Sequence, residues 1–207
     1  LLALVSMAMG RRIGLRQRTI LQESVASFSV GGIVRLIRLA LIGTATIEGL
    51  GAAALAFRFV PMLGWAKGLW YSVFHAISAF CNAGFDPFGF ENSIVPYVDD
   101  PVVNFVVMAL IILGGMGFSV ILDVLHARRW GRLTLHSRIV LLMTGILILF
   151  GMLMTCLLEW NNPNTIGDLT VPQKLMAALF QSVTLRTAGF ATFDQNALSD
   201  VSKAASD

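Results

Sequence analysis

Two glycines, Gly84 and Gly189, lie in the same short motif at places 105 positions apart. Each is the centre of Ala-Gly-Phe, and another Phe follows three positions further on, at Phe88 and Phe193. Glycine adopts backbone conformations that turn a carbonyl group out of a helix or strand at little cost. Carbonyl oxygens turned inward in this way replace the hydration shell of a cation in an ion filter. The motif therefore predicts two cation-coordinating turns, with an ordinary helix C-cap as the alternative interpretation of each glycine.

Other residues that carry chemistry are sparse. The chain contains no HExxH, GxSxG or P-loop motif, so we do not expect an enzyme. Cys81 and Cys156 lie in very different surroundings, which argues against a disulfide framework and a CxxC metal site. His75 precedes Ser78 by about one helical turn, and a packing hydrogen bond is expected there rather than a metal ligand or a proton relay.

The elements that must position the two turns are apolar helices. The chain is 56% hydrophobic and only 13% charged, about half the charged share of a soluble domain. Three segments approach the length of about 20 apolar residues that a spanning helix needs, namely Leu39–Phe57, Val102–Leu122 and Ile139–Leu158. The sequence therefore predicts an all-α polytopic membrane protein.

Charge predicts how these spans are oriented. Six arginines lie between Arg11 and Arg38 and four between His126 and Arg138, whereas the other connections are richer in acids. Basic residues in short loops mark the cytoplasmic side of a membrane, so both basic stretches are expected inside. They flank apolar spans, which makes nucleic acid an unexpected partner. Anionic lipid or a cytosolic regulatory ring are further partners that these arginines suit.

This orientation predicts that the glycine motifs are re-entrant. Leu39–Phe57 runs outward and Val102–Leu122 runs inward, so the segment between them begins and ends outside. Within it, Leu69–Phe85 is too short and too polar to span the membrane. Val171–Leu185 repeats the pattern as a short amphipathic helix, with Pro172 suited to its first turn. Because irregular backbone at membrane depth must be shielded by protein or line a cavity, both turns are expected to face a pore.

Four further positions carry specific expectations. Glu48 is the only acid inside a predicted span, and Arg186 is a candidate partner for it. Asp86 follows the first glycine turn and is expected at the outer mouth, where it raises the local cation concentration or serves as a solvated loop acid. The small residues of Gly114–Gly117 allow either close helix packing or a bend, and close packing is the favoured interpretation.

Several stretches resemble the Trk/Ktr/HKT superfamily of potassium transporters, most closely the membrane subunit of bacterial Ktr systems. The stretches are FHAISAFCNAGFDPFG, TLRTAGFATFD, ILGGMGF, IEGLGA and RRIGLRQRTILQE. The resemblance implies four helix–pore loop–helix modules with pseudo-four-fold symmetry around one pore. On this basis residues 1–38 end the first module and add a cytoplasmic loop. Residues 39–125 are the second module, residues 126–138 a cytoplasmic loop, and residues 139–207 a third module without its return helix, so the chain is expected to be an internal fragment.

The resemblance also implies which residues bind the ion. Position 81 departs from the family pattern, which commonly has Asn there, so the packing behind the carbonyls is expected to differ. In related transporters a serine at the first filter glycine accompanies sodium permeation, and both glycines here favour potassium. The implied potassium-binding filter consists of Cys81, Asn82, Ala83, Gly84, Phe85, Arg186, Thr187, Ala188, Gly189 and Phe190.

The function implied by the resemblance is potassium uptake across the bacterial plasma membrane by a multi-pass subunit. The alternative is a secondary transporter with discontinuous helices for another monovalent cation such as sodium. The resemblance further implies a homodimer with a cytosolic nucleotide-binding regulatory subunit, and it suggests a sodium requirement. No covalently bound cofactor and no metal beyond the transported potassium are expected.

Overall fold

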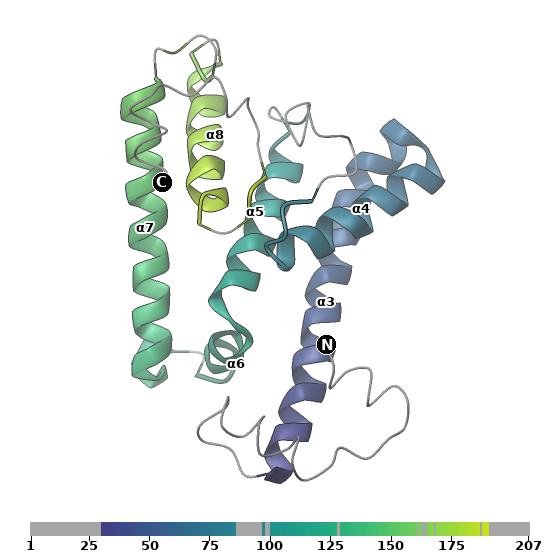
Figure 1. Cartoon of the computed structure of the whole chain (residues 1–207), viewed down its shortest axis with the longest axis vertical. Coiled ribbons are helices and arrows are strands. Elements are labelled where there is room, and N and C mark those ends of the chain that lie inside the picture. The colour runs from purple at the N-terminus through teal and green to yellow at the C-terminus, as the bar shows by residue number, and fades with distance from the viewer. Residues whose placement is uncertain are drawn as a thin grey trace. The chain divides into compact units, whose positions relative to one another are not determined.

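The computed structural model describes residues 30–85, 97, 100–127, 129–160, 162, 165–167, 169–186 and 188–190. The regular elements of these residues are helices (Figure 1), which confirms the all-α prediction. In chain order they are α3 (Val30–Leu63), α4 (Trp65–Phe80), α5 (Pro101–Met116), α6 (Phe118–Ala127), the 3₁₀ turn η2 (Trp130–Arg132), α7 (Leu135–Glu159) and α8 (Val171–Thr184).

The chain divides into two units, residues 1–46 and residues 47–207. The first unit contributes the beginning of α3 to the described part. Within it the hydroxyl of Thr46 donates a hydrogen bond to the carbonyl of Ile42, one helical turn earlier. The contacts described below all lie within residues 47–207.

Among the described residues, two helices are long and apolar enough to cross a membrane by length and composition, Leu36–Leu63 and Leu135–Glu159, or three spans if the bent pair of α5 and α6 counts as one. The predicted spans Leu39–Phe57 and Ile139–Leu158 lie inside them, so both predictions are confirmed as helices. Large apolar side chains of α7, such as Leu149 and Leu153, are exposed along this helix. Exposed apolar side chains are unfavourable in water and favourable in the hydrocarbon of a membrane.

The third predicted span, Val102–Leu122, is divided between two helices. α5 and α6 are bent by 98° relative to each other at Gly117, within the segment for which a bend was the alternative prediction. The φ of Gly117 is 83°, a left-handed value that ends the regular hydrogen bonding of α5. Glycine allows this conformation without a steric penalty, so the chain turns there although its hydropathy continues unchanged.

The two short helices form where the sequence predicts them. α4 overlaps the predicted re-entrant segment Leu69–Phe85 and begins four residues before it, and α8 coincides with the predicted helix over Val171–Leu185 to within one residue. At 16 residues α4 is about 24 Å long, short of the hydrocarbon thickness of about 30 Å. Pro172 lies in the first turn of α8, and Oε1 of Gln173 accepts hydrogen bonds from the backbone N–H and the hydroxyl of Thr170.

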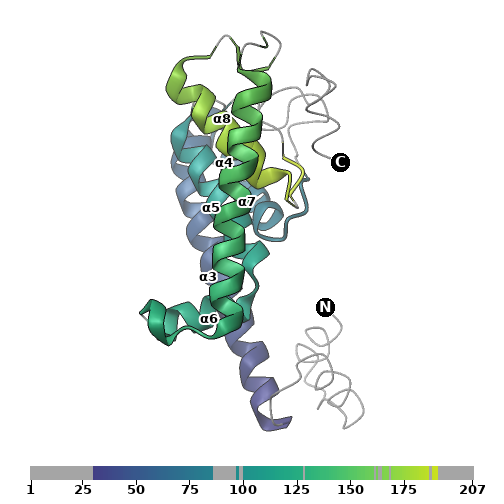
Figure 2. The same ribbon diagram turned by 90° about the vertical axis from the view of Figure 1, so that its left-hand side faces the viewer.

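The core lies where α5 packs between the two short helices. α5 contacts both α4 and α8, and α8 in turn lies against α7 (Figures 1 and 2). Because α5 contacts both short helices, it fixes the positions of the two glycine motifs that follow these helices. The core side chains with no more than 1% exposure include Phe59 of α3, Ala76 and Ala79 of α4, Val103 and Val107 of α5, Phe180 and Val183 of α8, and Phe190.

The connection from α6 to α7 is held by a hydrogen-bonded cap. The hydroxyl of Thr134 accepts from the backbone N–H of Ser137 at 3.3 Å, as an N-cap does. Oδ2 of Asp123 accepts from both the N–H and the hydroxyl of Thr134, at 2.9 and 2.7 Å. Asp123 therefore connects α6 to Thr134, the residue before α7. Thr134 lies within residues 126–138, where the sequence predicts a cytoplasmic loop.

Candidate functional site

The first glycine turn follows a helix end that another residue has already closed. The N–H of Asn82 donates to the carbonyl of Ala79, and the N–H of Ala83 donates to the carbonyl of Ser78. Together with a φ of 51° at Asn82, these bonds form a Schellman motif, the common C-terminal cap of a helix. Gly84, with a φ of 67°, lies two residues beyond this cap. The C-cap interpretation therefore does not account for Gly84.

The second turn is built differently. The N–H groups of Ala188 and Gly189 both donate to the carbonyl of Thr184, at 2.9 and 3.3 Å. Gly189 has a φ of 73° and so takes part in closing the end of α8. The C-cap interpretation thus holds in part for Gly189, whereas in the first turn Asn82 has that role.

The two turns lie against each other. A Cβ atom built on Gly84 would overlap the carbonyl oxygen of Ala188 and lie 3.3 Å from Cα of Gly189. The backbone of the second turn therefore occupies the place that a side chain at position 84 would need. Two motifs 105 positions apart in the chain meet backbone to backbone, and a glycine at position 84 is what permits this contact.

Both short helices point their C-terminal ends at this contact. α4 ends at Phe80 and α8 ends at Thr184, each a few residues before its glycine. The C-terminus of a helix carries a partial negative charge, and its last carbonyl groups lack partners within the helix. The meeting place of the two turns thus combines two electronegative helix ends with irregular backbone, which is an environment that favours a cation.

α5 packs directly against the end of α4. A Cβ atom on Gly114 would overlap the carbonyl oxygen of Phe80, and one on Gly115 would lie 3.7 Å from Nδ2 of Asn82. The favoured prediction of close packing at Gly114–Gly117 is confirmed for Gly114. The alternative of a bend is confirmed for Gly117, so the four-residue segment does both.

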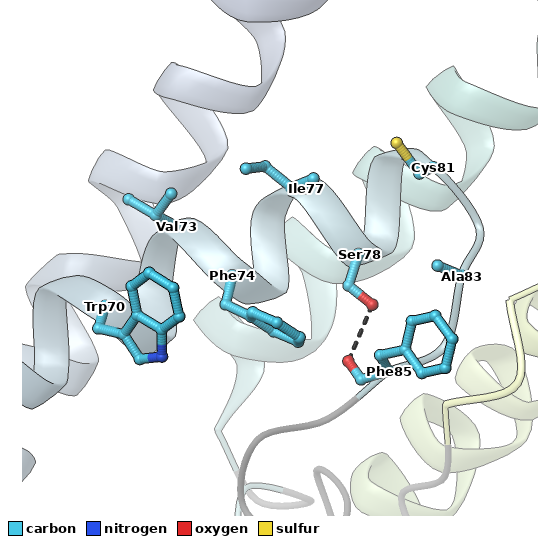
Figure 3. Close-up of a pocket in the computed structure, with 8 residues that line it drawn as sticks. All are labelled: Trp70, Val73, Phe74, Ile77, Ser78, Cys81, Ala83 and Phe85. Atoms are coloured by element: carbon cyan, nitrogen blue, oxygen red, sulfur yellow. Dashed lines mark hydrogen bonds between the residues drawn. The ribbon is translucent and has the colours of Figure 1, made fainter. Parts of the chain in front are cut away.

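A buried hydroxyl near the end of each short helix bonds to its turn. Oγ of Ser78 donates to the carbonyl of Phe85, and Oγ1 of Thr184 donates to the carbonyl of Phe190, both at 2.8 Å. The first of these bonds is drawn in Figure 3. Sequence reasoning missed both, since it considered Ser78 only as a neighbour of His75. The available signal was a hydroxyl in the last turn of each short helix.

His75 connects the first short helix to the second turn. Its ring is fully buried and stacks on Phe190, with ring centroids 6.2 Å apart and an interplanar angle of 24°. Phe59 of α3 contacts the same ring at 5.5 Å. Nδ1 donates to the carbonyl of Tyr71 at 2.8 Å, so the expected packing hydrogen bond exists, with Tyr71 in place of Ser78 as its partner.

Glu48 and Arg186 have different neighbours from those expected. The thiol of Cys81 lies 4.0 Å from Oε1 of Glu48, which places the intramembrane acid beside the first turn. Nη2 of Arg186 donates to Oγ1 of Thr144 on α7 at 3.4 Å. The departure at position 81 therefore faces the one acid that the predicted spans contain.

The two phenylalanines that follow the glycines have opposite surroundings. Phe190 is 1% exposed, whereas Phe85 is 69% exposed and borders a groove of about 210 Å³ beside α4 (Figure 3). The lining of this groove is nearly all apolar, so it does not offer the oxygen ligands that a cation needs. Its lining residues are Trp70, Val73, Phe74, Ile77, Ser78, Cys81, Ala83 and Phe85.

Ten of the twelve residues assigned to the filter, the mouth and the intramembrane charge lie among the described residues. Asp86, predicted at the outer mouth, and Thr187, predicted in the second filter turn, lie outside them. Of the rest, Ala83, Gly84, Ala188 and Gly189 belong to the two turns that meet.

Comparison with known proteins gives consistent matches. A model of the family described as "TrkH: Cation transport protein" matches residues 10–205. Ktr system potassium uptake protein B of Bacillus subtilis (strain 168) is 42% identical over 191 residues, which cover 92% of this chain and 42% of that protein. The Ktr system potassium uptake protein B of Vibrio alginolyticus is 41% identical over 187 residues, covering 89% of this chain and 41% of that protein.

A third relative carries sodium in its name. Potassium/sodium uptake protein NtpJ of Enterococcus hirae is 38% identical over 184 residues, which cover 89% of this chain and 40% of that protein. The chain thus spans about two fifths of the length of these relatives.

Proposed function

Because the chain belongs to the TrkH family of cation transport proteins, we propose that it conducts potassium into the bacterial cell through a carbonyl-lined filter. In this proposal the two glycine turns form two of four sides of the filter in a multi-pass plasma membrane protein. The observation that carries it is the backbone contact between Gly84 and Ala188, at the electronegative ends of α4 and α8.

The proposed mechanism needs only backbone chemistry. A potassium ion that sheds its water is stabilised by carbonyl oxygens held at a fixed spacing and by the partial negative charge of the helix ends. The filter segments are Cys81–Phe85 and Arg186–Phe190. The carbonyls of Phe85 and Phe190 each already accept a hydrogen bond from a hydroxyl. The principal ligands of the ion are therefore the carbonyls of the residues before them in each turn.

Acidic side chains add to the attraction for cations in this proposal. Asp86 is assigned to the outer mouth, where a carboxylate raises the local cation concentration. Glu48 lies beside Cys81, behind the first turn. Its position supports a role in holding the conformation of the first turn through the side chain of Cys81, and not in binding the ion directly.

The assembly that we propose follows the Ktr resemblance. Two of the relatives are named as proteins of a Ktr system. We propose a homodimer of membrane subunits bound on the cytoplasmic side to a nucleotide-binding regulatory subunit. The part of the described chain that would face this subunit or anionic lipid is the connection between α6 and α7, with Arg129 and Arg132, together with the first turn of α7, with Arg138. A sodium requirement for uptake belongs to the same proposal.

One observation favours the alternative of a secondary transporter with discontinuous helices, namely the 98° break between α5 and α6. The two proposals differ in how flux is driven. Potassium entry that follows the membrane potential, without a fixed ratio to a second ion, supports the filter. Entry in fixed stoichiometry with a second ion supports the transporter.

Growth of a potassium-uptake-deficient bacterium at low potassium tests the proposal. The wild-type protein, expressed from its complete gene, is expected to restore growth, and Gly84→Ser is expected to lose most of that growth because Ala188 blocks a side chain there. Gly145→Ser on α7 is the matched control, since a Cβ atom at this helical glycine has no described atom within 4 Å.

Two outcomes contradict the proposal separately. A wild-type protein that reaches the membrane and does not restore growth excludes potassium uptake. A Gly84→Ser variant that grows like the wild type, with normal membrane insertion, excludes Gly84 from the filter.

A further inference from the structure

Two hydroxyl side chains, Ser78 and Thr184, make the same unusual bond in the two modules. Each is nearly fully buried, at 5% and 4% exposure, and each lies at the C-terminal end of its short helix. Each donates at 2.8 Å to the carbonyl of the residue directly after the filter glycine. We propose that Ser78 and Thr184 are positioning residues that set cation selectivity by holding the two filter turns, an inference that rests on the proposed function.

Their bonds differ from those of two other buried hydroxyls, which bond within their own helices. Ser72 donates to the carbonyl of Gly68, and Thr155 donates to the carbonyl of Gly151, each four residues back in the same helix. A hydroxyl in a helix commonly makes this local bond, which needs no other element. Ser78 instead bonds to a carbonyl seven residues later, and Thr184 to a carbonyl six residues later, each in the turn that follows its helix. Each bond therefore constrains the backbone of that turn.

The two modules share the bond but not the sequence position of its donor. Ser78 precedes Gly84 by six residues, whereas Thr184 precedes Gly189 by five. The residue 105 positions after Ser78 is Val183, and the residue 105 positions before Thr184 is Ala79, both buried and without a hydroxyl. The donor has moved by one residue, and the bond to the carbonyl after the glycine is the same.

The two helices end at different distances from their glycines, and this difference accompanies the offset. α4 ends at Phe80, four residues before Gly84, and Asn82, with a φ of 51°, closes it before Gly84 is reached. α8 ends at Thr184, five residues before Gly189, and Gly189 itself takes part in closing it. Two different paths thus end in one geometry, which points to the bond itself as the feature that the filter needs.

The bond acts on the peptide groups next to it. Fixing the carbonyl of Phe85 or Phe190 fixes the exit of each turn, because a peptide group is planar and only φ and ψ can rotate between neighbouring groups. With the helix end fixed on one side and this carbonyl on the other, the carbonyls between them keep their direction. Loss of one such hydrogen bond changes the balance between turn conformations by roughly fivefold.

Selectivity between cations of different size follows from this rigidity. A turn without this hydrogen bond can move its carbonyl oxygens closer together around a smaller ion. A turn with the hydrogen bond keeps the spacing between its carbonyl oxygens that suits one ion. The expected consequence of losing either hydroxyl is more sodium transport relative to potassium, with protein folding and membrane insertion preserved.

The test compares variants that remove the hydroxyl with variants that retain it. Ser78→Ala and Thr184→Val remove the donor, and Thr184→Val keeps nearly the same volume. Ser78→Thr and Thr184→Ser retain the donor and are expected to restore the wild-type behaviour. Ser72→Ala and Thr155→Val are the controls, because they remove buried hydroxyls that bond within their own helices.

The first readout is the ratio of sodium to potassium uptake by the complete protein in vesicles. We expect it to rise roughly fivefold in each donor-removing variant and to stay unchanged in the controls. An unchanged ratio in both donor-removing variants overturns the proposal. An equal rise in the controls also overturns it, because the effect would then be general loosening.

The second readout does not depend on transport. Amide hydrogen exchange of the purified complete protein is expected to accelerate at Ala83 in Ser78→Ala and at Gly189 in Thr184→Val, whose N–H groups bond to the helix ends. If the wild type carries no potassium, the proposed function fails, and this exchange alone decides whether the hydroxyls hold the turns. Unchanged exchange at both turns overturns the inference. Failure of both donor-removing variants to insert, while both controls insert, overturns it as well, because the hydroxyls would then be folding residues.

Discussion

Gly84 and Gly189 are both glycines with positive φ, and each is required for its own reason. At Gly84 the carbonyl of Ala188 occupies the position of a side chain, so any substitution displaces backbone. At Gly189 the described residues leave the space around a Cβ atom open, and only the backbone conformation disfavours another residue. The same residue type in the same motif thus has a steric role in one turn and a conformational role in the other.

This difference predicts unequal effects of alanine at the two positions. Gly189→Ala is expected to destabilise the protein by about 1–2 kcal/mol, the cost of a left-handed conformation for an L-residue. Gly84→Ala carries the same cost and must also separate the two turns, so we expect a larger loss of thermal stability and the loss of most potassium uptake. Thermal unfolding in detergent and uptake in cells check this order. Equal effects of the two substitutions would contradict the contact between the turns.

At the scale of elements, α5 determines where the first turn lies. Gly114 brings α5 against the carbonyl oxygen of Phe80, the last residue of α4. The same helix packs against α8, so one element sets the distance between two helix ends. Three residues further on, Gly117 ends α5 and turns the chain by 98° into α6. Packing beside the first turn and the direction of α6 are therefore set by neighbouring glycines of one segment.

Gly114→Ala tests the packing of α5 against α4. The added methyl group meets backbone, and overpacking of this kind typically costs about 1–3 kcal/mol, so we expect lower thermal stability and reduced uptake. Gly145→Ala on α7 is the matched control, because it makes the same change in a helix where space is open, and alanine there gains about 0.5–1 kcal/mol. Thermal unfolding of both variants in one detergent measures the difference. A Gly114→Ala variant as stable as Gly145→Ala would exclude the close contact.

At the scale of the whole molecule, the distribution of charge determines which ends of the helices face the cell interior. Arg129 and Arg132 lie in the connection between α6 and α7, whereas α8 begins near the other end of α7 and runs back along it (Figure 1). The ends of a spanning helix face opposite aqueous phases. The proposed filter therefore requires that the arginine-bearing connection be cytoplasmic.

Labelling of single cysteines tests this topology. In a background with Cys81→Ser and Cys156→Ala, a membrane-impermeant thiol reagent added to intact cells is expected to label Val171→Cys and to leave Arg132→Cys unlabelled. Both positions are exposed in the structure, so both should react once the membrane is permeabilised. Labelling of Arg132→Cys in intact cells would reverse the orientation and remove the re-entrant interpretation of α4 and α8.

Local features of the sequence were sufficient to predict the elements. The helices α3, α7 and α8, the position of α4, and the two glycine turns follow from hydropathy, charge and glycine, because each depends on a window of neighbouring residues. The break at Gly117 could not be predicted with them. Hydropathy is the same for a straight and a bent span, and GGMG suits both packing and bending.

The family was thus determined by the sequence alone, and the kind of site is predicted from a motif repeated 105 positions apart. Only the tertiary structure decided that Ala188 meets Gly84, that Cys81 faces Glu48, and that Ser78 and Thr184 bond to the two turns. These contacts join residues whose separation in space depends on how α5 packs between α4 and α8. A hydroxyl or a thiol has no fixed partner until that packing sets the path of the backbone beside it.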